Sequence, residues 1–163
     1  MLCSPMRDEK AIFSQRITKD GVYDIKLLFS EIKHWYDSND YDWEELGNVT
    51  KEKDKGIEVS STLEGVKLIE DYYKRTIKVE FLITRINKVT VKDMKLDKAK
   101  VEIIITSYLT TDVKNLYHSA FGDFFKKLKD DYINFYEKKG QVGRLFVESQ
   151  DLVATIKHAL GMP

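Results

Sequence analysis

The chain has almost none of the residues that disulfides, thiolate metal sites and membrane spans require. Cys3 is the only cysteine, which excludes an intramolecular disulfide and a cysteine-based zinc site. No apolar run is long enough to cross a membrane, and residues 1–9 lack the apolar stretch of a secretory signal. We therefore expect a soluble cytoplasmic protein that does not associate with membranes.

Sequence motifs of known catalytic sites are also missing. The eight glycines are dispersed, so the chain contains neither a Walker loop nor a dinucleotide fingerprint, and it has no nucleophile elbow. His118 and His158 have no second histidine four residues away, as a helical zinc-hydrolase motif requires. We predict no catalytic residues, no cofactor and no metal, and we favour a non-enzymatic protein over an enzyme.

Neither sign of charge is in excess. The 163-residue chain carries 27 basic and 27 acidic side chains, which removes the uniform positive field on which non-specific nucleic-acid binding usually relies. Its length suits one unit that buries its own core. We expect a single domain over residues 1–163, with a flexible start at residues 1–9.

The chain does contain a long alternation of apolar and polar residues in its middle. Apolar side chains fall on odd numbers from Thr76 to Val91 and from Leu96 to Leu109, with a polar break at Lys92 to Lys95. A period of two is typical of strands that bury one face. The two segments predict an antiparallel hairpin whose dry face another element must cover.

Further strands are predicted before this hairpin. Residues 41–51 and 57–68 form a second predicted hairpin around a turn at residues 53–56, and residues 10–17 a short first strand that ends at a turn over residues 19–21. The apolar parity changes at Gly65, which predicts a β-bulge there and hence a bent sheet.

Three segments show the helical period of three to four residues. The first runs from Val22 to Tyr36 with Asp20 or Asp24 as its N-cap, and it stops in the polar residues 37–40. The other two follow the last strand. One begins at the capping residues 110–112 and extends to the Gly140 region, and the next spans residues 142–160 with Gly161 as its C-cap.

The order of these elements is a first strand, a helix, four strands in two hairpins, and two helices. This order predicts an α+β fold, with an antiparallel four- to five-stranded bent sheet and helices packed on one face.

The long helix predicted after residue 112 is rich in Tyr and Phe, which has two interpretations. Its off-stripe aromatic residues either pack against the last helix, which we favour, or mark a cavity wall or a subunit contact. A pocket between the sheet and this helix would be lined by Phe81, Ile103, Phe121 and Phe124. Helix-grip domains that hold apolar ligands have a similar architecture, but a fold does not fix a function.

Positive charge gathers on the even-numbered face of the central strands. The members of this basic face are Lys74, Lys78, Lys88, Lys98 and Lys100. A wet basic sheet surface can meet an anionic polymer, but lysine also keeps an exposed sheet face soluble. We favour the solubility interpretation and predict that nucleic acid is not a partner, because no aromatic residue lies among these lysines to stack a base.

A second group of titratable residues lies at the end of the first predicted helix. His34 and Asp37 are three residues apart and can share a helix face, which is compatible with one metal ion. The alternative, which we favour, is that His34 benefits from the helix C-terminus and the acids form a solvated loop.

The segments from Val22 to Trp43, Lys78 to Leu109 and Asp151 to Leu160 carry a family resemblance. The first segment contains a predicted helix that ends in the pattern W-[FY]-x-x-x-x-Y-[DE], carried by Trp35, Tyr36 and Tyr41, and long Lys- and Glu-rich strands follow. This pattern resembles a group of short archaeal proteins of unassigned function. The resemblance implies an archaeal source and brings no activity, ligand or catalytic residue with it.

Three functions remain open on the sequence alone. The first is a non-enzymatic interaction or scaffold domain that associates with itself or with another protein through a sheet edge or the aromatic helices, because well-marked secondary structure stands beside no catalytic motif. The second is a helix-grip-like binder of small apolar ligands. The third is nucleic-acid binding through the basic face.

Overall fold

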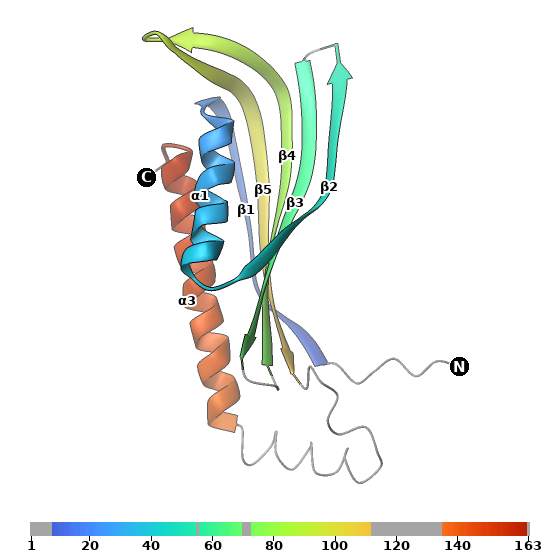
Figure 1. Cartoon of the computed structure of the whole chain (residues 1–163), viewed down its shortest axis with the longest axis vertical. Helices are drawn as coiled ribbons and strands as arrows, with labels where there is room; N and C mark the ends of the chain where they lie inside the picture. The colour runs from blue at the N-terminus through green and yellow to red at the C-terminus, as the bar shows by residue number, and fades with distance from the viewer. Residues whose placement is uncertain (1–7, 55, 70–72, 112–134, 163) are drawn as a thin grey trace, which may run out of the picture.

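The computed structural model describes residues 8–54, 56–69, 73–111 and 135–162. Over these residues it contains a five-stranded antiparallel sheet and two helices (Figure 1), which confirms the α+β prediction. The strands are β1 (Asp8–Tyr23), β2 (Asp42–Lys53), β3 (Gly56–Ile69), β4 (Tyr73–Val91) and β5 (Met94–Thr111). The helices are α1 (Ile25–Ser38) and α3 (Phe135–Ala159). The strand order is β1-β5-β4-β3-β2, so β1 and β2 form the two edges.

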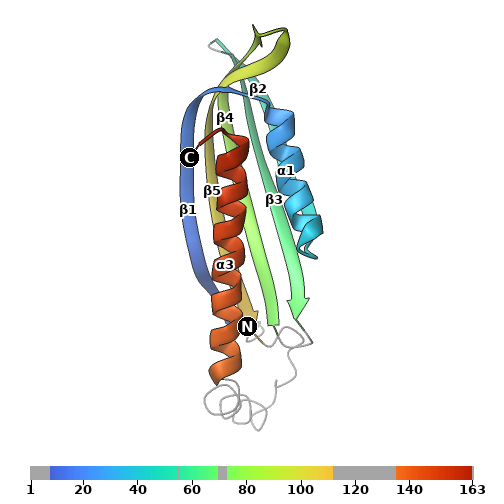
Figure 2. The ribbon, with the colours of Figure 1, turned by 90° about the vertical axis from the view of Figure 1, so that its left-hand side faces the viewer.

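Both helices cover the same face of the sheet (Figure 2). The odd-numbered residues of the central strands supply the covered face, as the alternation predicts. They include Ile77, Val79, Phe81 and Ile83 on β4 and Val101, Ile103 and Ile105 on β5, all buried. The even-numbered neighbours lie on the other face, which we call the outer face. No helix of the described residues is long and apolar enough to span a membrane.

α1 begins later than predicted because β1 is longer than predicted. β1 runs through the turn expected at residues 19–21 and ends at Tyr23, so Asp20 lies in a strand and Asp24 is the N-cap, accepting a hydrogen bond of 3.1 Å from the Leu27 amide. Gly21 is compatible with a strand when a neighbouring strand, here β5, fixes its backbone. The buried stripe of α1 consists of Leu28, Ile32, Trp35 and Tyr36.

α3 is one continuous helix through the position where a break is predicted. It starts at Phe135 and passes Gly140 without interruption, so the helix end expected in the Gly140 region is wrong. The buried side is formed by Leu145, Leu152, Val153 and Ile156. Just beyond its end, the Leu160 carbonyl accepts a hydrogen bond of 2.5 Å from the Lys19 ammonium, which satisfies one of the carbonyls at the helix C-terminus. Residues 112–134, where most of the predicted long aromatic helix falls, lie outside the described residues.

The bulge predicted at Gly65 is also wrong. Gly65 pairs in unbroken register with Trp43 on β2 and Ile77 on β4. Its lack of a side chain has another reason: a Cβ atom built on Gly65 would lie 2.3 Å from Cε1 of Tyr36. Glycine is therefore required because the buried ring of α1 rests directly on the strand backbone.

The register shifts that do occur lie elsewhere, and the most consequential one is at Arg85. The β4–β5 pairing slips between Thr84 and Asn87, and Arg85 has a φ angle of 56°. β4 has one extra residue here, so each later side chain of β4 points to the face opposite to the one that its number predicts. Val89 and Val91, predicted on the covered face by their odd numbers, are consequently paired with Leu96 and Met94 on the outer side.

Candidate functional site

The structure brings together two of the four residues predicted to line a ligand pocket. Phe81 and Ile103 are directly opposite each other on β4 and β5, and both are buried. The ring of Phe29 on α1 lies 4.6 Å from the ring of Phe81, centroid to centroid. Phe121 and Phe124 lie outside the described residues. A ligand pocket lined by all four residues therefore stays a prediction.

His34 and Asp37 have different hydrogen-bond partners. Asp37 accepts a hydrogen bond of 2.9 Å from the indole of Trp43, whereas the exposed His34 lies 3.4 Å from the Ser38 hydroxyl. Within the described residues, no group of three histidine, cysteine, aspartate or glutamate side chains is placed to hold a metal ion. Both residues instead line an open hollow of about 500 Å³ along α1, together with Ile25, Lys26, Phe29, Ser30 and Lys33.

The five lysines of the predicted basic face are separated in the structure, and two of them form ion pairs with acidic side chains. Lys78 forms an ion pair of 3.3 Å with Glu80 on the outer face. Lys88 follows the Arg85 bulge and pairs at 2.6 Å with Asp97, which belongs to the covered face, so it leaves the group. Lys98 and Lys100 remain together on the outer face, and Lys74 lies several residue pairs away, opposite Thr110. The five lysines therefore do not form one continuous positive surface.

A buried polar cluster lies between α3 and the sheet. Arg75 on β4 is only 3% exposed, and its guanidinium donates to the carboxylate of Glu148 at 2.9 Å and to the side-chain oxygen of Gln141 at 2.6 and 3.1 Å. The Tyr41 hydroxyl donates to the second oxygen of Glu148. Two residues of α3 thus tie the helix to β4 and to the segment before β2.

The protonation of Tyr41 follows from this environment. Burial raises the pKa of the Tyr41 phenol well above its usual range, and the hydrogen bond to Glu148 and the charge of Glu148 raise it further. The phenol is therefore neutral at physiological pH and can only donate to the carboxylate. Arg75, Gln141, Glu148 and Tyr41 all satisfy one another, which is the arrangement of a structural network rather than of a reactive centre.

An exposed apolar patch lies at the β1 edge of the sheet. Phe146 and Val147 on α3 are 42% and 63% exposed. The ring of Phe146 contacts the ring of Phe13 on β1 edge-on, with 5.6 Å between centroids. We call Phe13 and Phe146 the edge patch. α3 runs beside β1 (Figure 2), and within the described residues no strand pairs with the other side of β1.

Neither Arg75 nor Phe146 is among the site residues predicted from the sequence, although the sequence carries a signal for both. Arg75 has the odd number of the buried residues Ile77 and Val79, so its parity places it on the covered face. Phe146 follows directly on Leu145, whose stripe continues at Leu152 and Ile156. Adjacent residues on a helix point about 100° apart, so Phe146 is turned out of that stripe.

Comparisons with known proteins add no function. No protein-family model matches the chain, and no curated protein matches it. A solved structure of an uncharacterised protein from Rhizobium leguminosarum is similar to 94% of this chain and 99% of its own, with 8% sequence identity and a TM-score of 0.23. At that level of similarity the match carries no argument about this protein.

Proposed function

We propose that this chain is a cytoplasmic, non-enzymatic interaction domain that forms a homodimer through β1 and the edge patch. The observation that carries the proposal is the exposure of Phe146, whose ring contacts Phe13 on β1, an edge strand of the sheet formed by the described residues. A strand edge presents free amide and carbonyl groups, and a second strand can add to it. Apolar side chains beside such an edge supply the burial that backbone pairing alone lacks.

The two edges of the sheet differ in the way that this proposal requires. β2 carries a register shift between Leu46 and Val49, and Gly47 has a φ angle of 59°. Nearly all its side chains are exposed, and many are charged. Bulges and charges are the usual protection of an edge against pairing. β1 has its own register shift between Ala11 and Phe13, but it pairs with β5 in unbroken register from Phe13 to Tyr23, and residues 13–18 contain only one charged side chain, Arg16. β1 is therefore the edge more suited to a partner strand.

Two glycines in α3 favour a partner helix at the same place. Gly140 and Gly143 lie inside the helix, and a Cβ atom at either would meet nothing within 4 Å. Glycine in a helix interior is unfavourable by about 1 kcal/mol relative to alanine. Nothing in the described part of the chain requires this lack of a side chain, whereas a second helix packing closely on α3 would. A two-fold axis beside β1 would bring two copies of α3 together.

Phe146→Glu is expected to weaken dimerisation about 100-fold or more, because two copies of a buried ring are replaced by two like charges. Sedimentation velocity over a wide range of protein concentration measures this change. Leu27→Glu is the matched control: Leu27 is 48% exposed on α1, away from the edge patch. A wild-type chain that stays monomeric at high concentration would refute self-association, and equal effects of both variants would refute the location.

Gly143→Ala is expected to change the stability of the monomer and the strength of the dimer in opposite directions. We expect this variant to raise the free energy of unfolding of the monomer by about 0.5–1 kcal/mol through helix propensity, and at the same time to weaken the dimer. Urea unfolding at low concentration and sedimentation at high concentration give the two quantities. A variant that is more stable and dimerises as well as the wild type would show that no second helix approaches Gly143.

A further inference from the structure

Arg85 occupies a backbone conformation that suits glycine better than arginine. Its φ angle of 56° is in the left-handed region, at the bulge that interrupts the β4–β5 register. A side chain in this region is unfavourable because of contacts of its Cβ atom. Residues held in such conformations gather at binding sites, where the side chain itself is needed. The strained residue here carries a guanidinium group.

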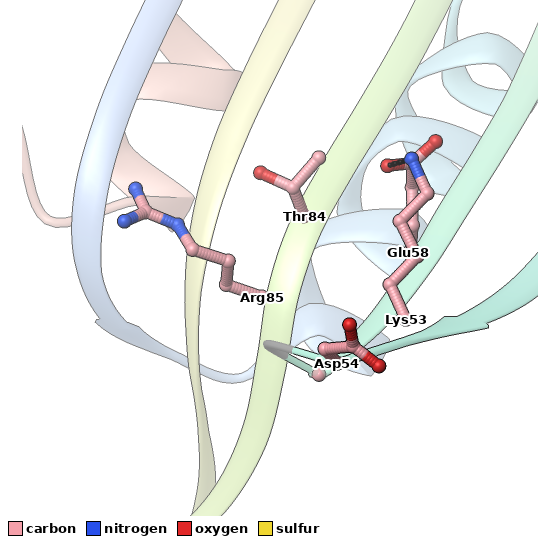
Figure 3. A pocket seen from close by; sticks show the side chains of 6 residues that line it. Lys53, Asp54, Glu58, Thr84 and Arg85 are labelled. Carbon is pink, nitrogen blue, oxygen red and sulfur yellow. Dashed lines mark hydrogen bonds and ion pairs between the residues drawn. The ribbon is translucent and has the colours of Figure 1, made fainter.

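The bulge redirects the Arg85 side chain across the outer face. Figure 3 shows it extending over β5 toward β1, away from Lys53 and Glu58. The guanidinium reaches Asp20 on β1, with 3.2 Å between Nη2 and Oδ2. The Asn87 amide donates to the Arg85 carbonyl at 3.2 Å, which supports the bulged backbone. Bulges commonly re-aim a side chain in this way.

Two hollows flank Arg85, and they differ in charge. The hollow drawn in Figure 3, of about 460 Å³, is lined by Lys53, Asp54, Gly56, Glu58, Thr84 and Arg85. Its Lys53 and Glu58 neutralise each other in an ion pair of 2.7 Å. The second hollow, of about 310 Å³, is lined by Asp20, Arg85, Asn87, Lys98, Ala99 and Lys100. It therefore has three cationic side chains and one carboxylate.

The second hollow carries uncompensated positive charge. Asp20 is engaged by Arg85, and neither Lys98 nor Lys100 forms an ion pair with any of the described residues. Both lysines are exposed and lie on the same face of β5, two residues apart. The chain as a whole has no net charge, but the three cations around this hollow lie close together and repel one another. An anion in the hollow would remove that repulsion.

We propose that the hollow beside Arg85 binds a small, doubly charged oxyanion, either free phosphate or the phosphate group of a small molecule. The planar guanidinium can hold two oxygens at once, and Lys98 and Lys100 add charge on the side facing β5. Asp20 occupies the guanidinium when no ligand is bound and competes with it. The volume is at the lower limit of ligand sites, which fits a small molecule.

The test is a titration with inorganic phosphate at constant ionic strength, followed by calorimetry or by the amide signals of residues 85–100. We expect saturable binding that Arg85→Gly weakens at least tenfold. This variant should keep its fold, checked by thermal melting in chloride, because glycine adopts the observed φ freely. Asp20→Asn should tighten binding severalfold by removing the competitor. Lys98→Gln and Lys100→Gln should each weaken it, and they decide the question if Arg85→Gly does not fold.

Lys26→Gln is the control, since it removes the same charge from α1 on the opposite face of the sheet. Binding that is absent in the wild type, or weakened equally by Lys26→Gln and Arg85→Gly, overturns the proposal. A parallel titration with glycerol phosphate distinguishes the two sources: tighter binding than phosphate assigns the site to a phosphorylated small molecule, and weaker binding to the free anion. Asp20 lies on β1, the strand proposed to pair in the dimer. The titration is therefore made at a protein concentration at which sedimentation shows a monomer, so that loss of phosphate binding and loss of dimerisation are measured separately.

Discussion

Replacing Gly65 with alanine is expected to lower the free energy of unfolding by about 3 kcal/mol, the upper part of the range for an overpacked core. The new methyl group would lie 2.3 Å from Cε1 and 2.5 Å from Cδ1 of Tyr36. The ring cannot retreat easily, because Tyr36 is fully buried and its hydroxyl donates to the Ile77 carbonyl at 2.9 Å. Relief therefore requires a shift of α1 away from the sheet.

Thermal or urea unfolding measures this cost, and a decrease in melting temperature of roughly 6–12 °C corresponds to it in a domain of this size. Gly143→Ala is the control, because it adds the same methyl group in open space. A second test is Gly65→Ala in a Tyr36→Leu background, where the ring is gone and the added cost should be small. A penalty for Gly65→Ala that is equally large in both backgrounds would show that the ring is not its cause.

The contact between Gly65 and Tyr36 also shows where sequence patterns mislead. A glycine at a change of apolar parity was a reasonable sign of a bulge, because bulges and glycines share strained backbone. The structure instead pairs Gly65 regularly and uses it to admit a ring from α1. Contacts between a strand and a helix distant in sequence leave no periodic trace, so the sequence could predict the antiparallel sheet but not the reason for this glycine.

The alternation of β4 and β5 was predictable because burial acts on each strand residue in turn. It predicted the covered positions from Ile77 to Ile83 and from Ala99 to Leu109. It failed after Arg85, where one inserted residue reversed the facing of Val89 and Val91. Neither glycine nor proline marks this bulge. The shift is visible only in the pairing with β5, which the sequence does not state.

The candidate sites were less predictable than the fold. Residues of the edge patch come from β1 and α3, and their meeting depends on which strand forms the sheet edge. The hollow beside Arg85 joins residues of β1, β4 and β5. A lysine-rich stretch could be seen in the sequence, but the separation of Lys98 and Lys100 from the ion-paired Lys78 and Lys88 requires the cross-strand neighbours.

The second large effect is expected in the polar cluster under α3. Glu148→Gln should lower the free energy of unfolding by about 4 kcal/mol, because it leaves the guanidinium of Arg75 buried without a counter-charge. The side chain of Arg75 is 4% exposed, whereas that of Glu148 is 21% exposed. Arg75→Met should therefore cost less, about 2 kcal/mol, since the remaining carboxylate is partly hydrated and still accepts the Tyr41 hydroxyl.

The double variant Arg75→Met/Glu148→Gln should be more stable than Glu148→Gln alone, because no buried charge remains. Urea unfolding of all four proteins gives the coupling energy. Asp20→Asn provides the exposed counterpart: it breaks the ion pair with Arg85, whose two side chains are 51% and 60% exposed, and should change stability by less than about 1 kcal/mol. Both variants break an ion pair, but only Glu148→Gln leaves a buried charge. A larger loss of unfolding free energy for Glu148→Gln than for Asp20→Asn therefore shows that burial, and not charge pairing alone, causes the effect. If Glu148→Gln cost no more than Asp20→Asn, the guanidinium of Arg75 would have access to water in solution, and α3 would not hold it against the sheet.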